Sequence, residues 1–416
     1  MKPESQSAMA PAPQRLDIVD ALRGSALFGI LLLHAVEHWD FMHPPTGLRA
    51  EWLLRLDGWT TGYAYLLFGG KAYAIFALMF GISFFLTLQG WQDRSRNAAG
   101  RFLWRLAVLG AMGYVHGLLY CGDILTVIAA LGVPLVLLNR LPSRALGWVA
   151  VLLLLQVPQW FDVLHVLTDA AFQPAQPRHW ALYALTDPVF ATGGAADVIR
   201  MNAWTGQAAK WWWVVETFRY PQMLGLFVCG LLIGRSGVLV DAPRLRRLAL
   251  QAFLAGAAGV ALVWLAHGGA ASLGLAGMRR RALDELLNMY GNLAQMAIWA
   301  GGFALLYPWA RARSVLRVLA PYGRMSLTCY TTQALFGVPF FYGFGLGMYR
   351  EVGAFHAVFF GLGVFVLQCA FAHWWLKRFA YGPLEWLWRA ATLRTVAVPM
   401  RRAKPLLAQP GTAPSV

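Results

Sequence analysis

Residues 16–36 of the chain read LDIVDALRGSALFGILLLHAV and form its first long apolar run. The run is long enough to cross a bilayer as one helix, yet it carries Arg23 near its start and His34 near its end. An ionisable side chain at membrane depth is costly unless it faces a partner or a watery cavity. At about 100° per residue, these two side chains return to within about 20° of the same helix face, about 16 Å apart along the axis. The sequence therefore predicts that this face lines a reaction cavity.

The composition is that of a protein that lies mostly in lipid. Hydrophobic residues make up 58% of the 416 residues and charged residues only 13%, and the mean hydropathy is +0.52. A soluble protein has about 25% charged residues. The net charge of +16 lies mostly in short loops, as the positive-inside rule expects, so no nucleic-acid partner is predicted. The four cysteines lie in or beside apolar runs without a CxxC pair, which indicates neither a disulfide nor a zinc framework.

The spacing of the apolar runs predicts an all-α fold, a polytopic transmembrane helix bundle of about ten spans with both termini cytoplasmic. The segments expected on the cytoplasmic side are basic, whereas Arg279 to Arg281 fall on the outer side and oppose the rule. This exception either removes one span or marks a functional basic patch. The predicted spans are about 16–36, 62–89, 102–120, 124–138, 145–161, 212–233, 248–266, 286–309, 325–345 and 353–376.

The same pattern divides the chain into five parts. Residues 1–14 are expected to be a disordered cytoplasmic tail, and residues 15–161 an N-terminal half of five helices. Residues 162–210 are expected to be an extracytoplasmic loop with amphipathic pieces. Residues 211–395 form a C-terminal membrane domain, and residues 396–416 a flexible cytoplasmic tail.

Several ionisable groups fall at the same predicted depth, near the outer surface. His34, His116 and Asp123 lie there, together with His38 and His43 from the following loop. A histidine beside a carboxylate can remove a proton from a hydroxyl or amine as it attacks a thioester. The structural alternatives are that His34 only packs at the membrane interface and that His116 and Asp123 only pair across a tight helical hairpin.

Three cations lie deeper or towards the cytoplasm and are candidates for binding an acyl donor. Arg23 and Lys71 are at membrane depth, and Arg324 is at the cytoplasmic mouth. Such cations suit the phosphates or amides of an acyl-CoA inserted from the cytoplasm. In the structural alternative, Arg23 pairs with Asp20 on the same helix face, and Lys71 snorkels or pairs with a carboxylate.

Other motifs are weak. His34, Glu37 and His38 form an H-x-x-E-H string, the order of one metalloprotease class, but nothing else in the sequence supports a metal. We predict no metal and no permanently bound cofactor, with acyl-CoA, above all acetyl-CoA, as a possible co-substrate.

Several longer stretches resemble a known family. The strings LDIVDALRGSALFGILLLH, KAYAIFALMFGISF and RLAVLGAMGYVHGLLYCGDILTVIAALG resemble the amino-terminal half of the YeiB family of bacterial multi-pass proteins. The strings LGLFVCGLLIGRSG, APYGRMSLTCYTTQALFGVPFFYGFGLGMY and HWWLKRFAYGPLEWLWRAAT resemble that family's C-terminal domain of unknown function. The resemblance covers most of the chain except residues 162–210 and both tails.

That family is generally grouped with the transmembrane acyltransferase superfamily, which includes the type 3 O-acyltransferases and heparan-alpha-glucosaminide N-acetyltransferase. The type 3 enzymes open with a pattern like LDxLRGxAxxxVxxxH, and residues 20–24 together with His34 fit its spacing. YeiB-like sequences more often carry Asn at this position, so His34 departs from them towards the enzyme-like pattern. The resemblance to the heparan-related enzymes points instead to His38 or His43 as the base.

The resulting hypothesis is an integral protein of the bacterial inner membrane that moves an acyl group, favouring acetyl, from a cytoplasmic acyl-CoA-type donor to a hydroxyl or amine acceptor at the outer face. His34 is the leading base, and His116 and Asp123 are its polar partners. The first alternative is a transporter or permease for a small anionic or lipidic solute. The second is a non-catalytic membrane protein. The acceptor, the acyl chain length and the oligomeric state stay open.

Overall fold

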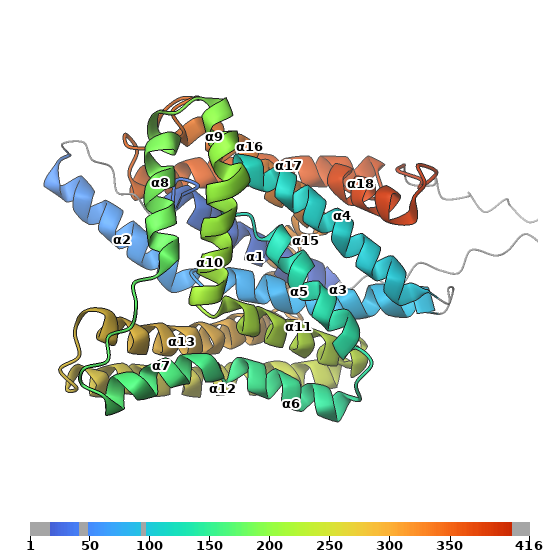
Figure 1. The fold of residues 1–416 in the computed structure, drawn as a ribbon. Coiled ribbons are helices and arrows are strands. Elements are labelled where there is room, and N and C mark those ends of the chain that lie inside the picture. Colours follow the sequence, from blue (N-terminus) through green and yellow to red (C-terminus); the bar gives the residue numbers. More distant parts are fainter. Residues whose placement is uncertain (1–16, 41–48, 93–96, 402–416) are drawn as a thin grey trace, which may run out of the picture.

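The computed structural model describes residues 17–40, 49–92 and 97–401, and helices dominate all three ranges (Figure 1). The predicted all-α class is therefore confirmed, while the predicted tail 1–14 lies outside the described residues. The elements are α1 (Asp17–Val36), α2 (Glu51–Leu67), α3 (Ala72–Gln92), α4 (Ala98–Leu119), α5 (Leu125–Leu138), α6 (Ser143–Leu154), α7 (Val157–Thr168), α8 (Arg178–Thr192), α9 (Ala195–Met201), η1 (Asn202–Gly206), α10 (Gln207–Glu216), α11 (Arg219–Arg235), η2 (Val238–Val240), α12 (Ala242–Ala271), α13 (Gly277–Leu306), α14 (Ala310–Leu316), α15 (Leu319–Arg324), α16 (Ser326–Phe341), α17 (Ala354–Arg378) and α18 (Pro383–Leu393).

Six helical stretches of the described chain are long and apolar enough to cross a membrane. The helix α5 is apolar but shorter. Length and composition thus support a multi-pass membrane protein. The six stretches are Asp17–Val36, Glu51–Trp91, Ala98–Leu119, Ser143–Thr168, Ala242–Ala271 and Ala354–Arg378.

The second apolar run differs from the prediction of one span over residues 62–89. Helix already begins at Glu51, inside the expected loop, and it is interrupted between α2 and α3. The interruption is built on Gly70, which has a φ of +74° that other residues rarely adopt. A side chain at this position would also collide with the amide of Asn292 on α13. The pair Gly69-Gly70 was the sequence signal for this break.

The segment 162–210 is mostly helical rather than an extended loop. It contains the end of α7, then α8, α9, η1 and the start of α10. Figure 1 shows α8 and α10 running across the direction of most other long helices. The segment docks on α4, where a side chain at Gly117 would meet the amide of Gln207 at 2.5 Å. Pro177 and Gly193 flank α8, Gly194 precedes α9, and Pro174 lies in the short non-helical stretch before α8.

Glycine allows the central helices to cross in close contact. A Cβ atom at Gly81 of α3 would collide with the backbone of α11, and one at Gly230 of α11 would collide with the backbone of α3. The same is true where α1 crosses α15, at Gly24 and Gly323. Small residues at such crossings let two backbones approach within van der Waals distance.

The arginine cluster that opposed the charge rule is held by local partners. Arg279 donates through Nη1 to the carbonyl oxygens of Asp169 (2.7 Å) and Ala170 (2.6 Å), just beyond the C-terminus of α7. Arg280 pairs with Asp284 at 2.9 Å. Cations at a helix C-terminus satisfy free carbonyl groups and interact well with the helix dipole. These arginines therefore have local partners that give them a structural role.

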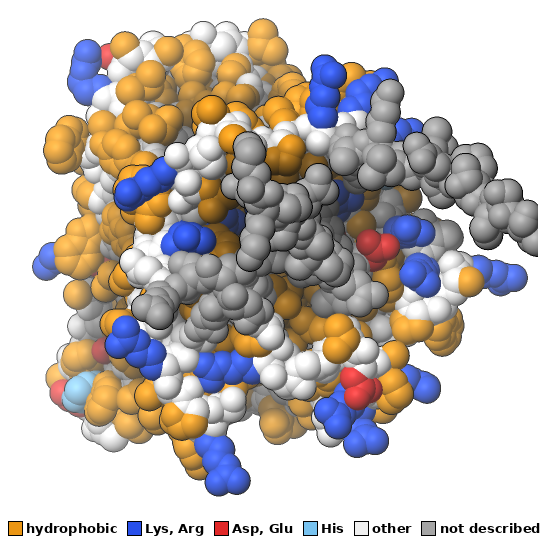
Figure 2. All heavy atoms as spheres, turned by 90° about the vertical axis from the view of Figure 1, so that its right-hand side faces the viewer, with side chains coloured by type: hydrophobic (Ala, Val, Ile, Leu, Met, Phe, Trp, Pro, Cys, Tyr) orange, Lys and Arg blue, Asp and Glu red, His pale blue; other side chains and the backbone are white. Residues whose placement is uncertain are grey.

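Charged residues gather at one end of the molecule. Figure 2 shows Lys and Arg side chains spread over the end at which α18 and the last turns of α3 lie. The described part of the predicted flexible tail, residues 396–401, packs back on α18, where Trp386 donates to the carbonyl of Val398 at 2.9 Å.

Candidate functional site

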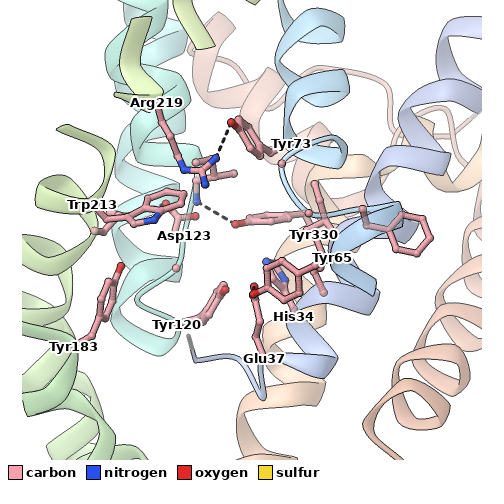
Figure 3. Close-up of a pocket in the computed structure, with 18 residues that line it drawn as sticks. His34, Glu37, Tyr65, Tyr73, Tyr120, Asp123, Tyr183, Trp213, Arg219 and Tyr330 are labelled. Atoms are coloured by element: carbon pink, nitrogen blue, oxygen red, sulfur yellow. Dashed lines mark hydrogen bonds and ion pairs between the residues drawn. The ribbon is translucent and has the colours of Figure 1, made fainter. Parts of the chain in front are cut away.

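A cavity of about 250 Å³ lies between helices from both halves of the chain, and we call it the His34 cavity (Figure 3). It is walled by α1, α2, the turn between α2 and α3, the start of α3, the turn between α4 and α5, α8, α10, the start of α11, and α16. Its polar lining includes the side chains of His34, Glu37, Asp123, Lys210, Arg219 and Tyr330. Helices of both halves of the chain thus contribute to one pocket around His34 and Asp123.

His34 lies in the last turn of α1 and lines this cavity. Its ring packs edge-on against Tyr120 at 5.0 Å and lies 6.1 Å from the ring of Tyr330. Its Nδ1 atom is buried and has no hydrogen-bond partner among the described residues. A buried polar atom without a partner costs free energy, so its persistence points to a ligand or a transferred proton.

His116 and Asp123 form a buried pair at the mouth of the α4–α5 hairpin. The ring Nδ1 of His116 lies 2.9 Å from Oδ1 of Asp123, and this carboxylate is fully buried. Because a carboxylate only accepts, Nδ1 carries the proton, and in the neutral imidazole Nε2 is then an acceptor. That Nε2 atom is buried and has no partner in the described chain. The other oxygen of Asp123 accepts from the backbone N–H of Thr126 at 3.0 Å, which fixes the carboxylate at the start of α5.

The two histidines share an aromatic wall. The ring of His116 lies 5.3 Å from Tyr330 and 6.2 Å from Tyr120, the same two tyrosines that pack on His34. Tyr330 is itself held in place, since its hydroxyl accepts from the backbone N–H of Ile124 at 3.0 Å. Asp123 lines the cavity, whereas His116 lies behind it. The structure thus brings together the three residues that were predicted to be catalytic, and their role is taken up as a proposal below.

Lys210 of α10 completes the cluster and was missed by the sequence analysis. Its ammonium donates to Gln207 at 2.6 Å and to Thr126 at 2.7 Å, and it lies 3.9 Å from Asp123. The side chain is only 2% exposed. A third N–H of the ammonium is left for a ligand. The signal was a lone Lys before the Trp-rich run 211–213, but it fell in the segment expected to be a loop.

Arg219 and Glu37 lie at opposite sides of the cavity. Figure 3 shows Arg219 pointing towards Tyr73, whose hydroxyl accepts from it at 2.7 Å, while Glu37 accepts from the hydroxyl of Tyr65 beside His34. The guanidinium also stacks 4.4 Å from the ring of Trp213. Glu37 was missed as a cavity residue because it lies one position beyond the predicted first span, whereas Arg219 lies within the predicted span 212–233 and was not selected.

The other predicted residues lie outside this cavity. Arg23 forms an ion pair with Asp20 at 3.1 Å and donates to Ser83 at 2.7 Å, as the structural alternative had it. His38 is buried on the ring of Phe341, with its Nδ1 atom 3.0 Å from a backbone carbonyl.

Lys71 and Arg324 line two further hollows. Lys71 belongs to a neighbouring groove. Arg324 lines a hollow of about 360 Å³ near Asp17, at the opposite end of α1. His43 lies outside the described residues.

These features define a class, an all-helical multi-pass membrane protein with a buried polar cavity between its helices. Residues 233–395 match the family model described as a protein of unknown function, DUF418. Residues 233–395 therefore resemble this domain, and the chain is similar to YeiB-type proteins over most of its length.

Relatives extend the similarity to most of the chain. The uncharacterized protein YeiB of Escherichia coli (strain K12) is 29% identical over 395 residues, which cover 90% of this chain and 96% of YeiB. The uncharacterized protein YxaH of Bacillus subtilis (strain 168) is 25% identical over 400 residues, 91% of this chain and 94% of YxaH. An uncharacterized 39.9 kDa protein of Bacillus acidopullulyticus is also 25% identical, over 379 residues. No solved structure matches the chain.

Proposed function

We propose that the protein is an integral-membrane acyltransferase whose reaction takes place in the His34 cavity. The observation that carries the proposal is the buried, unpartnered Nδ1 of His34 beside the His116–Asp123 pair. Such an arrangement suits proton removal from a nucleophile in a space shielded from bulk water. The acyl group, favouring acetyl, comes from a thioester donor of the acyl-CoA type.

In this proposal His34 takes the proton from a hydroxyl or amine of the acceptor as that group attacks the thioester carbonyl. The C–O or C–N bond forms, the C–S bond breaks, and the proton passes from His34 to the departing thiolate. The free N–H of Lys210 is available for the oxyanion of the tetrahedral intermediate. Asp123 positions both His116 and Lys210, and His116 supports His34 through the shared aromatic wall.

The donor is proposed to bind from the arginine-rich end. Arg324 lies in the hollow there together with Arg317. From Asp17 to His34, α1 spans about 26 Å, the distance between this hollow and the His34 cavity along the helix. Arg23 lies along α1 between the Arg324 hollow and the His34 cavity and is proposed to line the path of the donor. Lys71 lines a different groove and is not assigned to the donor. The ten-span arrangement with cytoplasmic termini in an inner membrane belongs to this proposal, supported by the basic character of that end.

A transporter is the second candidate, and one observation favours it. Lys71 and Arg219 are membrane-depth cations without an ion-pair partner in the described chain, as expected for the pathway of an anionic solute. Uptake of an anion into proteoliposomes without consumption of a donor would favour the transporter over the enzyme.

The decisive experiment measures donor binding and acyl transfer separately on purified full-length protein. We expect the wild type to bind acetyl-CoA and to transfer acetyl to a hydroxyl or amine acceptor. His34→Gln should keep donor binding and lose transfer, whereas Arg324→Ala should lose donor binding. His356→Gln, an exposed histidine on α17, is the matched control and should behave as wild type. Full transfer by folded His34→Gln protein would refute the assignment of the base.

A further inference from the structure

A second hollow of about 730 Å³ adjoins the His34 cavity, and we call it the Lys71 groove. It lies between the break that joins α2 to α3 and the hairpin of α12 and α13. Tyr65, Gly69, Gly70 and Arg219 line both hollows. The two hollows therefore share a wall, and a ligand in the groove lies next to the reaction cavity.

The groove holds two cations that lack a carboxylate partner. The ammonium of Lys71 donates to the backbone carbonyl of Tyr65 at 2.9 Å and is only 5% exposed. Arg219 is hydrogen-bonded to the hydroxyl of Tyr73, and within the described residues neither cation forms a salt bridge. The one carboxylate that lines the groove, Glu285, is already paired with Arg281. The groove thus carries positive charge that the protein itself leaves unbalanced.

A row of amide side chains faces these cations from α13. Asn288, Asn292 and Gln295 are spaced four and three residues apart, which places them on one helix face. None of the three side chains forms a hydrogen bond with another described residue. The sequence analysis missed this row because it followed charged residues only. Amide N–H groups beside cations are typical of sites that bind phosphate or carboxylate oxygens.

The outer wall of the groove is apolar and exposed. Val260, Val263 and Trp264 of α12 line it, and Trp264 is 74% exposed. Its neighbours Leu262 and Leu265 are exposed as well. Only 11% of the apolar window of α12 is buried, and Figure 1 shows α12 beside α13 at the edge of the helix bundle. A ligand here has its charged part at Lys71 and an apolar part along α12.

We infer that the Lys71 groove binds the phosphate of an anionic amphiphile that enters sideways from the bilayer. Lys71 and Arg219 neutralise the phosphate, the amides of α13 hydrogen-bond it, and the acyl or prenyl chains lie along α12. The assignment of this amphiphile as the acceptor in the neighbouring cavity rests on the proposed function. Binding itself does not depend on that function and can be measured without turnover.

The test is lipid binding to full-length protein in detergent, measured by native mass spectrometry and by titration. The probes are dioctanoyl phosphatidic acid, dioctanoyl phosphatidylcholine with the same chains, and glycerol 3-phosphate, the head without chains. We expect phosphatidic acid to bind at least about tenfold more tightly than either of the others. Lys71→Met and the triple variant Asn288→Leu, Asn292→Leu, Gln295→Leu should each weaken it about tenfold or more.

The control variant is Lys377→Met at the end of α17, which removes a lysine outside the groove and should bind as wild type. Equal binding of phosphatidylcholine, or unchanged phosphatidic acid binding in both groove variants, would overturn the inference. Glycerol 3-phosphate binding as tight as that of phosphatidic acid would overturn the lipid part and leave a soluble-anion site. If the lipid binds as expected but no acyl transfer is found, the proposed function fails and this inference stands.

Discussion

Each end of α1 carries an ionisable side chain within an apolar run, but the two side chains differ in the partners that surround them. At its beginning, Arg23 is bonded to Asp20 and Ser83, and Asp17 lies 3.5 Å from Arg317. At its end, the Nδ1 atom of His34 is buried without a described partner. An ionisable group in a membrane helix is thus not by itself a functional signal. The difference lies in whether neighbouring elements satisfy it, which separates groups that stabilise the fold from groups available for chemistry.

Substitution of His34 should have the largest effect, a loss of acyl transfer without a loss of stability. His34→Gln keeps most of the volume of the ring and removes the base, so we expect the rate of acyl transfer to fall by about 10²- to 10⁴-fold. The measurement is kcat with acetyl-CoA and the accepted acceptor, together with the thermal unfolding temperature. Donor affinity and unfolding temperature should stay near the wild-type values. A fall in transfer that only follows a loss of folded protein would contradict the distinction between the two ends.

The buried Asp123 contributes to stability and to the proposed chemistry. Its substitution should therefore have the second-largest effect. Asp123→Asn leaves Lys210 as a buried cation without its carboxylate, which costs about 3–5 kcal/mol in comparable buried pairs. The double variant Asp123→Asn, Lys210→Met should recover much of this stability, because no charge is left unpaired. We expect acyl transfer to stay low in both proteins. The measurements are denaturant or thermal unfolding in detergent and the transfer rate; recovery of activity along with stability would make Asp123 purely structural.

The convergence of His34, His116 and Asp123 could be predicted because it depends only on depth. Each lies near the same predicted end of a span, and the turn between α4 and α5 is too short to separate His116 from Asp123. Lys210 could not be predicted in this way. Its position depends on helices between residues 162 and 210 that dock through tertiary contacts, such as Gln207 on Gly117.

Some features of the fold could likewise be predicted from the sequence, and others depend on tertiary packing. The helix class and most long apolar helices follow from hydropathy, which reports local transfer free energy. The break between α2 and α3 was missed because apolar residues continue on both sides of Gly70. Whether such a run stays one helix is decided by packing, here by the amide of Asn292 against the glycine. The row of amides on α13 had a readable spacing, but amides carry no charge and were not counted.

The crossing of α1 with α15 should be sensitive to a single methyl group. A Cβ atom at Gly323 would collide with the carbonyl oxygen of Asp20, and backbone cannot move aside as a side chain can. We expect Gly323→Ala to lower the free energy of unfolding by about 1–3 kcal/mol. Gly363→Ala on α17, where a Cβ would meet no atom within 4 Å, is the matched control. Unfolding of both variants in detergent gives the comparison, and equal stability of the two would mean that the helices are not in close contact.

Arg23 should show the smallest effect, since it lies at the satisfied end of α1. The charged groups of Arg23 and Asp20 are 18% and 15% exposed, so water partly screens their ion pair. Arg23→Met should therefore lower the free energy of unfolding by only about 1 kcal/mol. The chemical step at His34 should keep its wild-type kcat, while a role of Arg23 along the donor path would appear as a higher KM for acetyl-CoA. Unchanged KM would restrict Arg23 to stabilising the fold, and a large fall in kcat would show that the two ends of α1 are not as separate as their hydrogen bonds indicate.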